Sequence, residues 1–306
     1  MNYVTGWIRV AGLIGAMALW SATAAAADLL KPREVNAIPA SPPDRTFAYG
    51  SDANQFGQLF LPQGRGPFPV AVVIHGGCWK KFADLENTVP MSDALRKAGI
   101  ATWNIEYRRI GQPGGGWPGT HLDVGRAVDH LRVLGGEYAL DLDRVVVVGH
   151  SAGGHLAMWA AARARLPVGS PLYGSDALPV RGVVNLAGPL DMTANIAGYE
   201  ALCRDSVITS LLGGTPTAVP ERYAQVSPLA LLPLGVPQVL VWGEHEDFVP
   251  RPLVEAYARA ARQHGDSVRL IVMPGVGHFE IASPRASTWP RVAAAIRSLL
   301  DGQLPP

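Results

Sequence analysis

The sequence contains few charged residues, and the two signs nearly cancel. Asp, Glu, Lys and Arg make up 17% of the 306 residues, and 26 basic side chains face 25 acidic ones for a formal net charge of +1. Such a balance provides neither a basic surface for nucleic acid nor a strong field of one sign for a charged partner. We therefore expect no nucleic-acid partner.

Cysteine and metal-ligand patterns are equally scarce. Only Cys78 and Cys203 occur, and no spacing of Cys, His, Asp or Glu matches a metal site. We therefore predict no metal and no cofactor. A chain of this length can hold one large domain with a substantial core, so length alone does not require two domains.

The longest apolar stretch lies at the start of the chain. Arg9 precedes an apolar run over residues 10–20, and small residues at 21–27 offer an A-x-A cleavage site before Asp28. The run is too short for a confident membrane span. We expect a signal peptide at 1–27, a single domain over 28–306 and an exported protein, periplasmic or secreted, without stable membrane insertion. An uncleaved signal anchor is the alternative.

The most informative motif follows four consecutive valines at 145–148. They run into Gly149-His150-Ser151-Ala152-Gly153, and an Ala-rich segment with helical character comes next. A serine on a tight turn between a strand and a helix needs small neighbours, because the chain must fold back closely and leave Oγ exposed. The G-x-S-x-G in this context predicts a nucleophile at Ser151.

Partners for such a serine follow in the order Ser, acid, His. An apolar strand at 238–243 leads into a loop with Glu244, Glu246 and Asp247, and a strand at 268–273 leads into a loop with His278. Loops at the carboxyl ends of strands are where open α/β sheets place their sites. The order is that of one of the three common serine-hydrolase arrangements.

Elsewhere, strand and helix patterns alternate along the chain. Alternation of this kind implies a mostly parallel sheet covered by helices on both faces. We expect edge strands within 45–61, further strands at 70–74, 101–106, 145–148, 183–186, 238–243 and 268–273, and helices at 91–98, 120–134, 152–164, 253–263 and 290–300.

A second motif, His75-Gly76-Gly77-Cys78-Trp79, follows the strand at 70–74. With the elbow and the order of the triad, it makes the chain resemble α/β-hydrolase-fold serine esterases. The loop itself is similar to the HGGxW loop of kynurenine formamidases and the HGGG loop of hormone-sensitive-lipase-like esterases. The resemblance implies an α/β-hydrolase fold and an oxyanion hole formed by the backbone N–H groups of Gly77, Cys78 and Ala152.

The resemblance also indicates which acidic residue of the loop after 238–243 belongs to the triad. The family pattern at this turn is Asp-x-Val-Pro, which residues 247–250 fit, so the expected catalytic set is Ser151, Asp247 and His278. Glu244 and Glu246 are then interpreted as solvated loop carboxylates, with Glu246 as the remaining alternative for the acid.

Several further residues receive supporting roles. His75 is expected to anchor the oxyanion loop by hydrogen bonds, and residues 106–109 are interpreted as structural bracing. Asp123 is interpreted as a carboxylate in the first turn of a helix, where the helix dipole favours negative charge. Trp79 and Trp117 are candidate pocket residues. An insert at about 188–226 interrupts the alternation and is a candidate small cap, although a plain surface excursion fits it equally.

If the protein is exported, its two cysteines can form a disulfide, because exported proteins meet oxidising conditions. Cys78 and Cys203 are a candidate disulfide, with two separate buried thiols as the alternative.

The function expected from these features is hydrolysis of small carboxylic esters through an acyl-enzyme. Hydrolysis of an arylformamide, in the manner of kynurenine formamidase, and a small peptidase are the alternatives. A non-catalytic binding protein is a different class, disfavoured because Ser, acid and His are all present.

Overall fold

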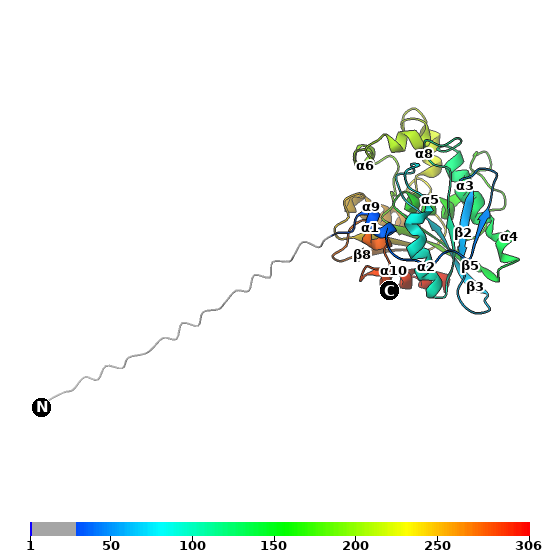
Figure 1. The fold of residues 1–306 in the computed structure, drawn as a ribbon. Coiled ribbons are helices and arrows are strands. Elements are labelled where there is room, and N and C mark those ends of the chain that lie inside the picture. Colours follow the sequence, from blue (N-terminus) through cyan, green and yellow to red (C-terminus); the bar gives the residue numbers. More distant parts are fainter. Residues whose placement is uncertain (2–28) are drawn as a thin grey trace.

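The computed structural model describes residue 1 and residues 29–306 (Figure 1). Apart from Met1, the predicted signal peptide lies outside the described residues. Among the described residues, no helix is long and apolar enough to cross a membrane.

One sheet of eight strands organises the molecule, in the order β1-β2-β4-β3-β5-β6-β7-β8. β1 and β2 are antiparallel, β2 is antiparallel to β4, and the remaining neighbours are parallel, as the alternating pattern predicted. The strands are β1 (Arg45–Ala48), β2 (Phe56–Phe60), β3 (Phe68–Ile74), β4 (Ala101–Ile105), β5 (Leu140–His150), β6 (Gly182–Leu186), β7 (Gln238–Gly243) and β8 (Val268–Met273).

Helices cover both faces of this sheet (Figure 1). They are α1 (Pro32–Asn36), α2 (Val89–Lys97), α3 (Gly119–Asp129), α4 (Leu131–Gly135), α5 (Ala152–Ala162), α6 (Ile196–Cys203), α7 (Val207–Leu212), α8 (Pro220–Val226), α9 (Arg251–Gln263) and α10 (Trp289–Leu300), with 3₁₀ turns at Leu85–Thr88, Arg163–Arg165 and Glu280–Ala282.

The two faces of the sheet form two separate cores, because side chains alternate along each strand. Val70 and Val72 of β3 pack in the cluster that includes α3, α5 and α9. Ala71 and Val73 pack in the other, with α2 and α10. Both faces are fully buried, so the central strands are continuous apolar runs, as expected for a parallel sheet.

Two predicted elements differ from the structure. The helix expected over 120–134 is interrupted at His130, which separates α3 from α4. β5 begins at Leu140 rather than at residue 145, because Leu140 and Asp141 pair with Phe68 and Pro69 before a register shift. The charged residues of this half-exposed start hid it from a search for apolar runs.

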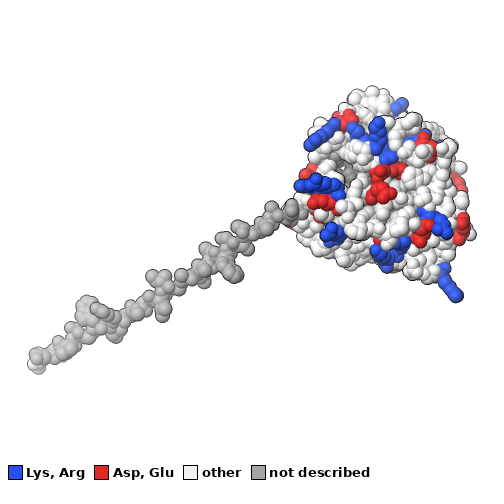
Figure 2. Space-filling model, in the orientation of Figure 1, with Lys and Arg blue, Asp and Glu red and all other residues white. Residues whose placement is uncertain are grey.

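The insert predicted at about 188–226 contains three short helices, α6, α7 and α8, between β6 and β7 (Figure 1). Charged side chains on the face drawn in Figure 2 are interspersed in sign over a mostly uncharged surface. This distribution agrees with the near-neutral composition.

Candidate active site

The turn from β5 to α5 holds Ser151 in a strained conformation. Its φ and ψ are 54° and −123°, in a region that side chains rarely occupy, and its N–H donates to Leu186 O at 2.9 Å. The glycines around it allow close approach of backbone. A Cβ on Gly149 would lie 2.0 Å from Gly153 O, and one on Gly153 would lie 2.1 Å from Ile74 O. Glycine is therefore required at Gly149 and Gly153, where the turn brings backbone atoms closest together.

His278 pairs with a carboxylate, but not with the one that the sequence pattern favoured. Its Nδ1 lies 2.9 Å from Oε1 and 2.8 Å from Oε2 of Glu246, and both side chains are almost fully buried. Asp247 is exposed. The prediction of Asp247 as the acid is therefore wrong in this structure, and the alternative, Glu246, occupies the position.

The loop after β7 explains this choice. Glu246 Oε1 accepts hydrogen bonds from the N–H groups of Phe248 at 2.7 Å and Val249 at 3.1 Å, so the carboxylate closes its own turn. The turn directs Glu246 inward and leaves Asp247 outside, while the Phe248 ring stacks on His278 with centroids 4.1 Å apart. The Asp-x-Val-Pro pattern could not reveal which neighbouring carboxylate turns inward.

His150, the residue before the serine, contributes a contact that the sequence did not predict. Its Nε2 lies 2.8 Å from the backbone O of His278 and donates to it, which fixes the loop that carries the base. Burial, with a smaller contribution from the charge of His278, lowers the pKa of His150 to about 3. The ring is therefore neutral at physiological pH.

The loop after β3 has an unusual backbone. Gly77, Cys78 and Trp79 have φ values of 106°, 55° and 55°, three successive left-handed residues. Among the described residues, the N–H groups of Gly77, Cys78 and Ala152 donate to no protein acceptor. Adjacent free N–H groups at a bend of this kind form a concavity suited to a negatively charged oxygen.

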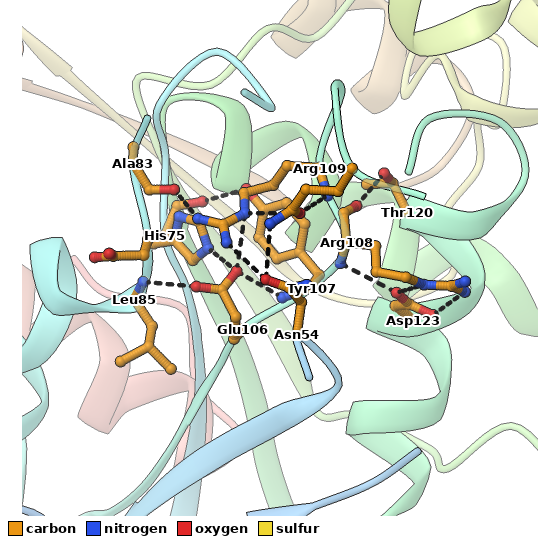
Figure 3. A network of polar contacts seen from close by, with 12 residues as sticks. Asn54, His75, Ala83, Leu85, Glu106, Tyr107, Arg108, Arg109, Thr120 and Asp123 are labelled. Atoms are coloured by element: carbon orange, nitrogen blue, oxygen red, sulfur yellow. Dashed lines mark hydrogen bonds and ion pairs between the residues drawn. The ribbon is translucent and has the colours of Figure 1, made fainter. Parts of the chain in front are cut away.

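A buried polar network holds this loop in place (Figure 3). His75 has Nδ1 2.8 Å from Gly76 O and Nε2 2.9 Å from Glu106 Oε1, and Tyr107 Oη donates to His75 O at 3.0 Å. Burial pushes the pKa of Glu106 upward, but the charge and hydrogen bond of His75 and the charge of Arg109 outweigh it, so the net shift is downward. These contacts match the anchoring role predicted for His75, and they show that the bracing expected of residues 106–109 acts on the oxyanion loop.

Asp123 belongs to the same network and not to a helix start. It is fully buried and accepts hydrogen bonds from Arg108 N, Nε and Nη2 at 3.1, 2.7 and 2.8 Å, and from Gln55 Nε2 at 2.7 Å. Its predicted role as a first-turn carboxylate is wrong, because it is the fifth residue of α3 and its partners come from other elements.

Two cavities meet at Ser151. The larger has a volume of about 550 Å³ and is bordered by Ser151, His278 and Gly77. The smaller has about 20 Å³ and is bordered by Ser151, Ala152, Trp79 and Tyr199, but not by His278. Cys78 borders both. The serine, the base and the oxyanion loop thus converge on one place.

Of the two tryptophans proposed for the pocket, only Trp79 borders one of the two cavities that meet at Ser151. Trp117 instead packs against the insert, with its backbone N–H donating to Leu211 O at 2.7 Å and the Arg222 guanidinium 5.7 Å from its ring centroid. The prediction that Trp117 lines the pocket mouth is therefore wrong, because the insert covers it.

Cys78 and Cys203 are joined by a disulfide, with Cα atoms 6.1 Å apart. This pairing is the one that the sequence raised. Both cysteines border both cavities, so the bridge forms part of the wall between them and ties α6 of the insert to the oxyanion loop.

Within the described part of the chain, no three His, Cys, Asp or Glu side chains are grouped so that they could hold a metal ion.

Comparison with known proteins assigns the family. A family model described as BD-FAE matches residues 58–257, more than half of the sequence, including the oxyanion loop, Ser151 and Glu246. The chain belongs to the BD-FAE family.

Curated relatives of this BD-FAE chain are named as esterases. It is 26% identical to Esterase LipQ of Mycobacterium tuberculosis over 76% of this chain and 55% of that protein. It is 27% identical to Esterase LipC of the same organism over 76% of this chain and 59% of that protein. The chain thus spans little more than half the length of these relatives. Their names agree with the resemblance to esterases.

Solved structures confirm the predicted α/β-hydrolase fold. An Esterase B from Lactobacillus rhamnosis superposes with a TM-score of 0.71 at 18% identity, over 88% of this chain and 91% of that one. A bacterial heroin esterase superposes with a TM-score of 0.65 at 25% identity, over 85% and 84% of the two chains.

Proposed function

We propose that this BD-FAE chain is a serine esterase with Ser151 as nucleophile, His278 as base and Glu246 as the acid. The observation that carries the proposal is that Ser151 and the Glu246-paired His278 border one cavity together with the oxyanion loop. Glu246 accepts a hydrogen bond from Nδ1–H of His278 and so holds the tautomer in which Nε2 is free to accept the serine proton.

The reaction follows from these positions. Ser151 Oγ attacks the ester carbonyl while His278 Nε2 takes its proton, and the N–H groups of Gly77, Cys78 and Ala152 stabilise the oxyanion. Collapse expels the alcohol, which receives the proton from His278. The same base then activates water, which releases the acid and regenerates the serine.

The two cavities suggest which part of the substrate goes where. The departing oxygen takes its proton from His278, so the leaving group belongs in the larger cavity, which His278 borders. The acyl group then enters the smaller one, whose volume of about 20 Å³ suits a single small group. We therefore infer that the substrates carry a small acyl group on a larger leaving group.

This geometry also favours a second candidate, hydrolysis of arylformamides. A formyl group is the smallest acyl group, and the aromatic rings of Phe82, Phe248 and Phe279 border the larger cavity. A peptidase would have to place an amino-acid residue and its chain in the smaller cavity, so we do not propose peptidase activity. Esters remain the first choice because their leaving groups depart more easily.

A series of aryl esters that differ only in the acyl group tests the proposal. We expect kcat/KM to be highest for formyl or acetyl and to fall by at least tenfold at hexanoyl, and we expect Ser151→Ala to remove this activity. N-formylkynurenine, compared on the same scale, separates the two candidates. A kcat/KM at least tenfold above the best ester would favour the arylformamidase, and highest activity on hexanoyl would contradict the assignment of the cavities.

We further propose that the protein is exported after removal of residues 1–27. The composition of the leader and the Cys78–Cys203 disulfide support this proposal, because disulfides persist in oxidising compartments. Cell fractionation with N-terminal sequencing tests it. A mature chain that begins at Asp28 outside the cytoplasm is expected, and a cytoplasmic chain that begins at Met1 would contradict it.

A further inference from the structure

A short segment that precedes the first strand forms part of the larger cavity. We call residues 29–38, which include α1, the strap. Pro32, Val35 and Asn36 of the strap border the cavity that contains Ser151 and His278, and none of them borders the smaller cavity. In Figure 1 the blue α1 lies beside the orange C-terminal part of the chain, although more than 200 residues separate them.

The strap is attached to the loop that carries the base. The N–H of Leu30 donates to Glu280 Oε1, and Glu280 Oε2 accepts from the N–H of Gly277 at 3.0 Å. Gly277 directly precedes His278, so one buried carboxylate connects the strap and the histidine loop.

Apolar burial secures the rest of the segment. Val35 and Ile38 are only 6% and 8% exposed, while Pro32 and Asn36 are exposed at the cavity. Just beyond the strap, the N–H of Ser41 donates to Asp93 Oδ2 of α2 at 2.9 Å. The strap is thus docked against the domain along its length and at both ends.

We propose that the strap determines which leaving groups the enzyme accepts, with Glu280 as the positioning residue that holds it against the His278 loop. This inference rests on the proposed function, since it assigns the larger cavity to the leaving group. Because the strap does not reach the smaller cavity, its substitution changes selectivity for the alcohol and not for the acyl group.

The test uses the full chain and two matched substitutions on α1. Asn36→Trp places an indole at the cavity, whereas Arg33→Trp places the same side chain at an exposed position that does not border it. Acetate esters of methanol, phenol and 2-naphthol form one substrate series, and phenyl esters of acetic and butyric acid form the other.

We expect Asn36→Trp to lower kcat/KM for 2-naphthyl acetate at least tenfold more than for methyl acetate, mainly through KM. The acetyl-to-butyryl ratio should stay within about twofold, and Arg33→Trp should change neither ratio. Equal losses on all alcohols, or the same change in Arg33→Trp, would overturn the inference.

Two further variants keep the inference testable if the indole displaces α1. Val35→Ala removes two methyl groups from a residue that borders the cavity and should weaken binding of 2-naphthyl acetate by up to about fifteenfold, at about 0.8 kcal/mol for each carbon. Glu280→Gln removes one of the two carboxylate acceptors and should shift the same alcohol selectivity. If neither variant alters it while the wild type is active on esters, the strap has no such role. A wild type inactive on every ester would instead contradict the proposed function.

Discussion

Replacing Glu246 by Gln tests most sharply whether Glu246 is the acid of the triad. The substitution preserves the shape of the side chain and replaces one acceptor oxygen by an NH₂ donor. Gln can keep its carbonyl oxygen on the N–H groups of Phe248 and Val249, where Glu246 Oε1 now accepts at 2.7 and 3.1 Å. Its NH₂ group must then face His278 Nδ1, where Oε2 now lies at 2.8 Å.

An NH₂ donor at this position reverses the tautomer of the base. Nδ1 of His278 must become an acceptor, so the proton moves to Nε2, the nitrogen that should receive the proton of Ser151. A wrong tautomer of this kind lowers kcat about 10⁴-fold in a serine protease whose triad Asp is replaced by Asn. The same loss here corresponds to about 5.4 kcal/mol of transition-state stabilisation.

The assay is kcat for an aryl acetate, measured beside Asp247→Asn and with thermal unfolding to show that each variant folds. We expect Glu246→Gln to lose about 10⁴-fold in kcat. Asp247→Asn should stay within about threefold, because Asp247 is exposed and Nδ1 of His278 is hydrogen-bonded to Glu246 instead. If Asp247→Asn were the crippled variant, or if Glu246→Gln kept more than a tenth of the wild-type kcat, the reasoning would be refuted.

Three other outcomes follow from the described contacts. Cys203→Ser should lower the free energy of unfolding by up to about 5 kcal/mol, since the bridge closes a loop of 125 residues, and the denatured, unreduced wild type should show no free thiol; two thiols would contradict the bridge. Arg108→Met should cost about 3 kcal/mol in urea unfolding, because the buried carboxylate of Asp123 loses its hydrogen-bonded cation and keeps only Arg126, whose Nη1 lies 3.9 Å away; a loss below 1 kcal/mol would show that the pair is not required. Burial lowers the pKa of His150 to about 3 and the pKa of His155 to about 4, so below about pH 6.5 the unfolded chain binds protons that the folded chain does not. The free energy of unfolding should therefore fall towards pH 4, by up to about 1.4 kcal/mol per pH unit for each ring. A free energy of unfolding that does not change with pH would contradict the burial of both rings in the neutral form.

The sequence predicted the features that depend on local pattern. The valines at 145–148 had to form a buried strand, and the glycines around Ser151 had to permit the tight turn, since any Cβ on Gly149 or Gly153 would meet backbone. Similar reasoning located the loop of Gly77 and the alternating strands and helices.

The predictions from the sequence were wrong or incomplete where contacts between distant segments decide the position of a residue. Glu246 and Asp247 are adjacent and chemically alike, and only the turn closed by the N–H groups of Phe248 and Val249 selects the inward one. Asp123 looked like a helix-start residue because its partner, Arg108, belongs to a separate segment. No role could be predicted for the strap, because its Pro- and Ala-containing sequence has no periodic pattern and its position depends on the distant Glu280.

The most direct test of the central claim, that Ser151 is an activated nucleophile, is to map the site of labelling by a fluorophosphonate probe with mass spectrometry. We expect one adduct per chain, on the peptide that contains Ser151, and at least a hundredfold slower labelling in Glu246→Gln. An adduct on another residue, or labelling that persists in Ser151→Ala, would contradict it.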